Sequence, residues 1–173
     1  MDTFSEILKI TLPALLVLIT AYVVIRNMLK NDQDRRHQDA LLQTVKTITP
    51  VKLQAYERIV LFLERISPES LIMRVAKPDQ SAQQLHTLLV TGIRSEYEHN
   101  LSQQIYMSND AWEVVKNARG NVVNLINSTA SRLPSSASGE ELSRLLIEEV
   151  MEMDKEPCRI AIDFLKAELA RII

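Results

Sequence analysis

The most pronounced pattern in the chain is an uncharged apolar run near its start. Residues 10–25 (ITLPALLVLITAYVVI) carry no charged side chain, and Ile7 and Leu8 extend the apolar character. A helix over residues 7–26 would be about 30 Å long, which matches the hydrocarbon core of a bilayer. Its apolar side chains would occupy every face, whereas a helix packed on a protein surface has one apolar stripe. The run therefore predicts a transmembrane helix that includes Ile7, Ile10, Leu15, Ile19, Tyr22 and Ile25.

Two other interpretations fit this run less well. A cleaved signal peptide has a basic start and small residues at its cleavage site, whereas Asp2 and Glu6 precede Lys9 here. A buried core helix would show one-sided amphipathicity, which the run lacks. We expect an uncleaved membrane anchor.

Basic residues follow the anchor. They lie at positions 26, 30, 35 and 36, while Lys9 alone precedes the apolar run. The positive-inside rule then places the N-terminus outside and the body in the cytoplasm, in a single-pass arrangement. We divide the chain into a membrane anchor (1–30), a juxtamembrane stalk and helix (31–48) and a helical bundle domain (49–173).

Beyond the anchor, apolar residues recur at helical spacing between capping and proline signals. Thr49-Pro50 and Ser67-Pro68 each combine a capping residue with a proline at the first helical position. Pro78, the PSSASG segment at 134–139 and Pro157 separate the later helices. No strand-like alternation appears. The pattern predicts an all-α fold, in which an antiparallel bundle of about five or six helices follows the transmembrane helix.

The same spacing predicts which side chains form the core and which residues cap the helices. The longest segment, 81–107, has a four-residue stripe that should wrap slowly around the helix. We expect Asp110 with Glu113, and Ser138 with Glu141, to form capping boxes. The expected core positions are Leu53, Tyr56, Ile59, Val60, Phe62, Leu63, Ile66, Leu85, Leu88, Leu89, Ile93, Tyr97, Leu101, Ile105, Trp112, Val115, Ala118, Val122, Leu125, Ile126, Leu142, Leu145, Leu146, Val150, Ile160, Phe164, Leu165, Leu169 and Ile172.

Composition and charge narrow the function classes. With 46% hydrophobic and 24% charged residues the chain is typical of a folded protein, not of a disordered tail. A formal net charge of -2 provides no basic field for nucleic acid. Cys158, the one cysteine, follows Pro157 near a helix start, where a thiolate would be favoured, but it is more simply a small packing residue. The three glycines lie too far apart for a phosphate-binding loop. Because the sequence shows no convergent set of reactive groups, we expect no cofactor and no enzymatic activity.

Three stretches resemble a known family. They are TPVKLQAYER at 49–58, LFLERISPE at 61–69 and EYEHNLSQQIY at 96–106, of which the last is the most specific. The chain is similar over nearly its whole length to an uncharacterised family of small Bacteroidota proteins with one N-terminal membrane helix and a helical cytoplasmic body. The resemblance implies membrane placement and a bacterial source, and it brings no activity, cofactor or catalytic residue.

One pair of residues could ligate a metal ion. Glu96 and His99 form a Glu-x-x-His motif, which places a carboxylate and an imidazole on one helix face. Di-iron bundles need a second such motif and further carboxylates, and this chain has no second copy. A hydrogen-bonding role is the simpler interpretation, and a metal-dependent bundle enzyme that uses Glu96 and His99 is an alternative hypothesis.

Our leading hypothesis is a non-enzymatic scaffold or interaction module, tethered to the bilayer, that binds an unknown protein or a second copy of itself. Tyrosine and arginine often anchor interfaces. The candidate interaction surface consists of Tyr56, Glu57, Arg58, Glu64, Arg65, Gln103, Gln104 and Tyr106. A protein whose body lies on the lipid surface is the third possibility.

Overall fold

A computed structural model describes the backbone of residues 2–172 and the side chains of residues 15–28, 30 and 48–171. The chain divides into two compact units, Met1–Thr49 and Pro50–Ile173. Within the described range all regular elements are helical, which confirms the all-α class: α1 (Asp2–Ile66), α2 (Pro68–Val75), α3 (Ala82–Asn100), the 3₁₀ helix η1 (Leu101–Tyr106), α4 (Asn109–Ser131), α5 (Gly139–Glu152) and α6 (Pro157–Ile172).

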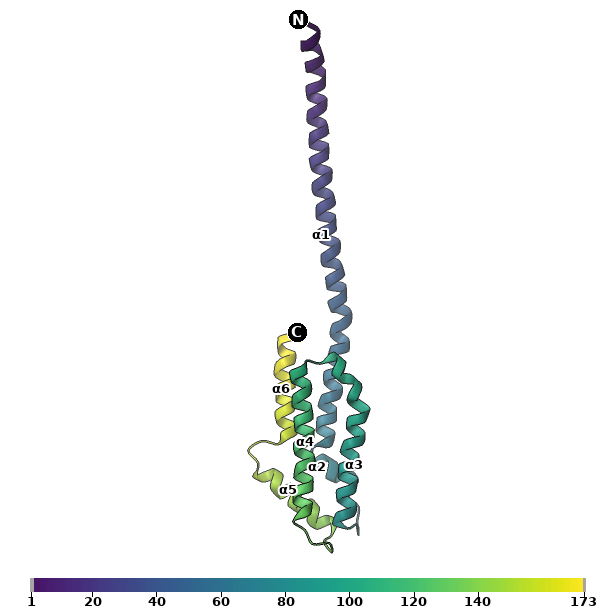
Figure 1. Ribbon diagram of the computed structural model, residues 1–173, viewed down its shortest axis with the longest axis vertical. Coiled ribbons are helices and arrows are strands. Elements are labelled where there is room, and N and C mark those ends of the chain that lie inside the picture. The colour runs from purple at the N-terminus through teal and green to yellow at the C-terminus, as the bar shows by residue number, and fades with distance from the viewer. Residues whose placement is uncertain (1, 173) are drawn as a thin grey trace. The chain divides into compact units, whose positions relative to one another are not determined.

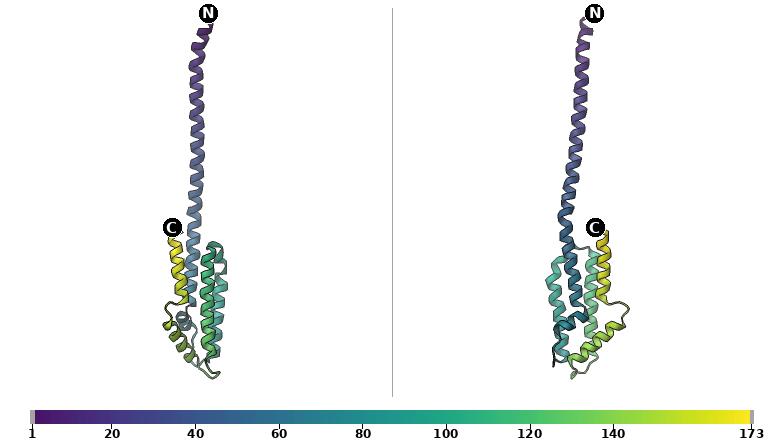
Figure 2. Two further views of the ribbon diagram at one scale, coloured as in Figure 1. Left: turned by 60° about the vertical axis from the view of Figure 1, so that its left-hand side comes forward. Right: turned by 180° about the vertical axis from the view of Figure 1, so that it is seen from behind.

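In the second unit, neighbouring helices run antiparallel. Figure 1 shows α6 alongside α4. Figure 2 gives two further views of these helices, and among α2 to α6 the most extensive contacts are those of α4 with α6, α3 with α4 and α3 with α5. The core lies between these helices and residues 50–66 of α1. Its largest fully buried side chains are Ile59, Phe62, Leu63, Ile66, Leu71, Leu85, Leu89, Ile93, Ile126, Leu142, Leu146 and Leu165.

The expected helix start at Thr49 is wrong, because α1 continues through Pro50. The expected juxtamembrane stalk at the start of the 31–48 segment is also part of α1, so this segment is helical throughout. No glycine or proline occurs between residues 26 and 49, so nothing in the sequence stops the helix there. A proline removes one intrahelical hydrogen bond, and here that loss does not end the helix.

The first unit exposes its described apolar side chains. Those between Leu15 and Met28, including the predicted transmembrane residues Leu15, Ile19, Tyr22 and Ile25, are 46–73% exposed. The side chains of Ile7 and Ile10 lie outside the described residues. Among the residues that could be searched, no helix has the length and apolar character needed to cross a membrane.

Capping explains where the helices of the second unit begin. Ser81 and Ser138 each complete a capping box, with Gln84 and Glu141 respectively, and the Ser138 box confirms the sequence prediction. The predicted box of Asp110 and Glu113 is wrong. Ser108 caps α4 instead, since its hydroxyl accepts a hydrogen bond from the Ala111 N–H at 3.0 Å.

The segment predicted as one helix over 81–107 divides after Asn100. The Asn100 side chain donates to the Glu96 carbonyl at 2.8 Å, and such side-chain bonds compete with the backbone ladder. The chain then continues as η1, where Leu101 is 40% and Ile105 is 72% exposed. Leu101 and Ile105, the last two residues of the predicted stripe, therefore lie at the surface. Leu88 is also exposed.

The buried face of α6 differs from the predicted one. Small residues, Cys158 and Ala161, are buried beside Ile162 and Leu165, and they allow close approach to the rest of the bundle. Ile160 and Phe164, which we expected in the core, are exposed. The predicted position of Ile172 lies outside the described side chains.

Candidate functional site

One of the eight predicted interaction residues is not at the surface. Tyr56 is buried, with 2% of its surface exposed, and this corrects its assignment to the surface. Burial, together with the neighbouring Glu168 carboxylate, raises the pKa of Tyr56 to about 12. The remaining seven lie on α1 or η1, and within the described residues no hydrogen bond or ion pair joins these two groups: Glu57, Arg58, Glu64, Arg65, Gln103, Gln104 and Tyr106.

Glu96, the carboxylate of the predicted metal pair, binds two arginines. Its Oε1 atom lies 2.6 Å from Nη2 of Arg65 and 3.6 Å from Nη1 of Arg74. Arg74 also donates to the backbone carbonyl of Arg65 at 3.0 Å. The carboxylate therefore links α1, α2 and α3, and two guanidinium groups share its Oε1 atom. His99 is exposed, and the described residues contain no group of three or more His, Cys, Asp or Glu side chains that could hold a metal ion.

Cys158 lies in an environment that disfavours a thiolate. The thiol is buried, and burial together with the Glu156 carboxylate raises its pKa. Glu156 itself has a raised pKa because it is desolvated and lies near the Glu64 carboxylate. These groups favour the packing role of Cys158 over a nucleophilic one.

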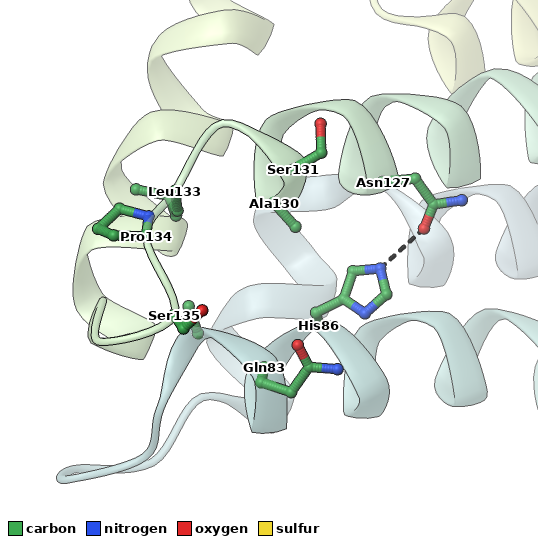
Figure 3. Close-up of a pocket in the computed structure, with 9 residues that line it drawn as sticks. Gln83, His86, Asn127, Ala130, Ser131, Leu133, Pro134 and Ser135 are labelled. Carbon is green, nitrogen blue, oxygen red and sulfur yellow. Dashed lines mark hydrogen bonds between the residues drawn. The ribbon is translucent and has the colours of Figure 1, made fainter.

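A hollow of about 430 Å³ lies where the start of α3 meets the end of α4. Figure 3 shows His86 facing Asn127 across it, with Nε2 of His86 2.8 Å from Oδ1 of Asn127. Gln83, Ser131 and Ser135 also line the hollow, and none of its described lining residues is acidic. The imidazole thus has an amide partner and no carboxylate to orient it as a general base.

A second hollow, the α3–α4 groove, combines apolar walls with an arginine. It encloses about 500 Å³ between the middle of α3 and the middle of α4. Its apolar lining residues are Val90, Ile93, Tyr97, Leu101 and Val123. Arg119, Gly120, Arg94 and Glu98 complete the walls together with Asn124.

An aromatic cluster supports one side of the α3–α4 groove. The Tyr97 ring stacks on Trp112 with centroids 5.7 Å apart, and it makes a tilted contact with Phe62 at 6.1 Å. The Arg119 guanidinium carbon lies 4.0 Å from the Tyr97 ring centroid, which is a cation–π contact. Tyrosine, tryptophan and arginine are the residue types that most often dominate binding energy at interfaces.

Sequence analysis did not identify the α3–α4 groove as a site. It placed Tyr97 and Trp112 in the core, and it gave Gly120 no role. The available signal was an Arg-Gly pair at 119–120 within an otherwise regular amphipathic helix. Such a pair shows neither which helix lies opposite nor that Tyr97 is beneath the guanidinium.

Comparison with known proteins identifies the family. A family described as "Family of unknown function (DUF7935)" matches residues 2–172. The chain belongs to this family. No curated protein and no solved structure matches the chain. Membership thus covers nearly the whole chain, and the family's description assigns no activity.

Proposed function

We propose that this protein is a single-pass membrane-anchored helical module, without enzymatic activity, whose body binds another protein in the cytoplasm. The observation that carries the proposal is the exposure of apolar side chains around the whole circumference of α1 from Leu15 to Met28. Water is a poor solvent for such a helix, whereas acyl chains remove this apolar surface from water. The uncharged run begins at Ile10, before the first described side chain.

The distribution of basic residues supports the proposed orientation. Arg26 and Lys30 directly follow the apolar run, and Arg35 and Arg36 come soon after. Basic residues beside a membrane helix are retained on the cytoplasmic side. We therefore place the body in the cytoplasm, at the inner membrane of a bacterium.

The side chains of the body support a binding role. The described reactive groups are engaged in structural contacts: Glu96 with two arginines, His86 with Asn127, and Cys158 within the core. The α3–α4 groove, by contrast, presents Tyr97 and Arg119 on apolar walls. Tethering at a membrane raises the local concentration of a module, so modest contacts suffice for binding.

Fractionation of cells tests the anchor. The intact protein should sediment with membranes and should resist an alkaline wash. Replacing Val17 and Leu18 with arginine should release it, because each arginine at the centre of a membrane helix costs about 2.5–3.5 kcal/mol on the insertion scale. The matched control exchanges the same positions conservatively (Val17→Leu, Leu18→Val) and should stay with the membrane.

Two results would contradict the proposal. If the uncut wild-type chain remains dissolved after ultracentrifugation without detergent, the anchor is wrong. If crosslinking in intact cells followed by mass spectrometry repeatedly recovers no partner, not even a second copy, the binding role is wrong.

A further inference from the structure

The α3–α4 groove contains a glycine that its own fold does not require. A Cβ atom added to Gly120 would meet nothing within 4 Å, and this glycine has an ordinary negative φ. Glycine inside a helix nevertheless costs about 1 kcal/mol relative to alanine. Because Gly120 has no side chain, the backbone of α4 is uncovered at this position of the groove. This allows a second helix to approach closely.

Arg119 provides the charge of the groove. Its guanidinium lies over Tyr97, and no carboxylate among the described residues pairs with it. Arg94, also at the groove, pairs with Glu98 at 2.9 Å, so Arg119 is the cation left without an acidic partner there. An incoming helix that carries a glutamate would complete this site.

The exposed side of α5 has the matching chemistry. Ile147 and Met151, one helical turn apart, are 38% and 80% exposed. Glu148 and Glu152 lie beside them and are also exposed. We name these four residues the α5 strip. Apolar residues at i and i+4 flanked by acidic residues are the pattern with which a helix enters a groove.

We propose that the α3–α4 groove binds the α5 strip of a second copy of this chain. This inference rests on the proposed function, since it names the protein that the body binds. Met151 would contact the Tyr97 ring, as thioethers favour aromatic edges, and Glu152 would pair with Arg119. A single contact between a groove and a strip leaves the strip of one copy and the groove of the other copy free. Further copies therefore add at these free surfaces and form open rows beneath the membrane, unless the rotation between copies closes a ring.

Site-specific crosslinking of the full-length protein in intact cells tests the contact. Two copies with different tags are co-expressed, one with Asn124→Cys at the groove and the other with Met151→Cys. A bismaleimide should join them several-fold more than it joins Asn124→Cys to Met73→Cys. Met73 is the matched control because it is also a methionine, is 81% exposed on α2 and is not part of the α5 strip. The native Cys158 is 1% exposed and should not interfere.

Charge reversal then tests the ion pair. Arg119→Glu in the groove copy should reduce the crosslink several-fold, and Glu152→Arg in the strip copy should restore most of it. Lys166→Glu on α6, the control for the same charge change, should leave the yield unchanged. Gly120→Leu should abolish the crosslink without destabilising the fold, which thermal unfolding of the same variant checks.

Equal yields with the Met151→Cys and Met73→Cys partners would overturn the inference, as would an Arg119→Glu loss that Glu152→Arg does not repair. Failure of the proposed function gives different results. If another protein is crosslinked but a second copy is not, only the inference fails. If the chain is absent from the membrane fraction, the anchor fails, while the crosslink between copies can still be measured in the soluble fraction.

Discussion

Gly120 and Gly139 lie in helices of the same unit, yet they differ in what an added methyl group would meet. At Gly139 the new Cβ would lie 2.8 Å from Cγ and 3.1 Å from the backbone oxygen of Gln80. At Gly120 it would meet nothing within 4 Å. We predict that Gly120→Ala raises the free energy of unfolding by about 1 kcal/mol. Gly139→Ala should lower it by about 1–3 kcal/mol. Urea denaturation followed by the fluorescence of Trp112, the sole tryptophan, measures both, and a loss of stability for Gly120→Ala would contradict the open wall of the groove.

Glu156 gives a pH dependence with a defined sign. Burial and then the Glu64 carboxylate raise its pKa above 4.5 in the folded state, and its Oε1 atom is buried without a hydrogen-bond partner. The folded state therefore favours the protonated form of Glu156. The stability that depends on this protonated form is fully present below the pKa of the unfolded state and is lost as the pH rises through the pKa of the folded state. We predict that Glu156→Gln is more stable than the wild type at neutral pH, and that the two converge below about pH 4.5. Denaturation over a pH series tests this, with the exposed Glu152→Gln as the charge-matched control. A difference that persists at acidic pH would exclude ionisation as its cause.

Single residues were predicted well where burial follows from periodicity alone. Ile59, Leu63 and Val115 are in the core as expected, because each lies in the middle of an apolar stripe. Tyr56 was predicted both as a core position and as part of the candidate interaction surface. The core prediction is the right one, because the side chain is buried and its hydroxyl lies inside the bundle beside Glu168. The sequence shows that residue 56 is a tyrosine, but it does not show that Glu168, on the distant helix α6, lies beside its hydroxyl.

At the scale of the element, α5 depends on its capping box. The Ser138 hydroxyl accepts from the Glu141 N–H at 3.1 Å, and the Glu141 side chain accepts from the Ser138 N–H at 2.8 Å. We predict that Ser138→Ala lowers the free energy of unfolding by about 1 kcal/mol, as is typical for loss of an N-cap. Ser136→Ala, an exposed serine in the same loop, should change it by less than about 0.5 kcal/mol. Equal effects in thermal unfolding would show that the cap is not what stabilises α5.

The contact of Glu96 with two arginines joins the helices α1, α2 and α3. Glu96→Gln should cost about 1–2 kcal/mol, since two charge-assisted contacts are weakened. Glu98→Gln, which affects only an exposed pair four residues apart on one helix, should cost about 0.5 kcal/mol or less. Zinc, iron or a chelator should leave the unfolding midpoint of the wild type unchanged. A midpoint raised by metal in the wild type but not in Glu96→Gln would support the metal-site alternative instead.

Helix ends that depend on local chemistry were largely predictable. Pro68 and Pro157 begin helices where expected, because proline suits the first turn, and residues 134–138 of the predicted linker are a loop. The continuity of α1 through Pro50 and the division after Asn100 were not predictable. The first depends on a long run of helix formers before the proline, and the second on a side-chain bond to Glu96 that is visible only in the folded helix. The α3–α4 groove was missed for a related reason, since it exists only between two helices.

At the scale of the whole molecule, the hydrophobic core formed by the described side chains lies within the second unit. Every buried residue of the core cluster falls between Tyr56 and Leu165. We predict that residues 50–173, expressed alone, fold cooperatively and keep the unfolding free energy of the full chain to within about 1 kcal/mol. Circular dichroism during urea titration measures this. A fragment that unfolds without a cooperative transition would show that the first unit is needed for the core.

The starts of α3 and α5 are joined in a way that bears on the order of folding. Ser81 and Ser138 form an isolated antiparallel bridge, in which the Ala82 N–H donates to the Ala137 carbonyl at 2.9 Å and the Gly139 N–H donates to the Gln80 carbonyl at 2.8 Å. All of α3, η1 and α4 lies between these partners in the chain, so the bridge closes a large loop while neighbouring turns form locally. Both amides are released only when the two helix starts separate. They should therefore exchange with solvent deuterium at similar rates and report together on the last step of assembly.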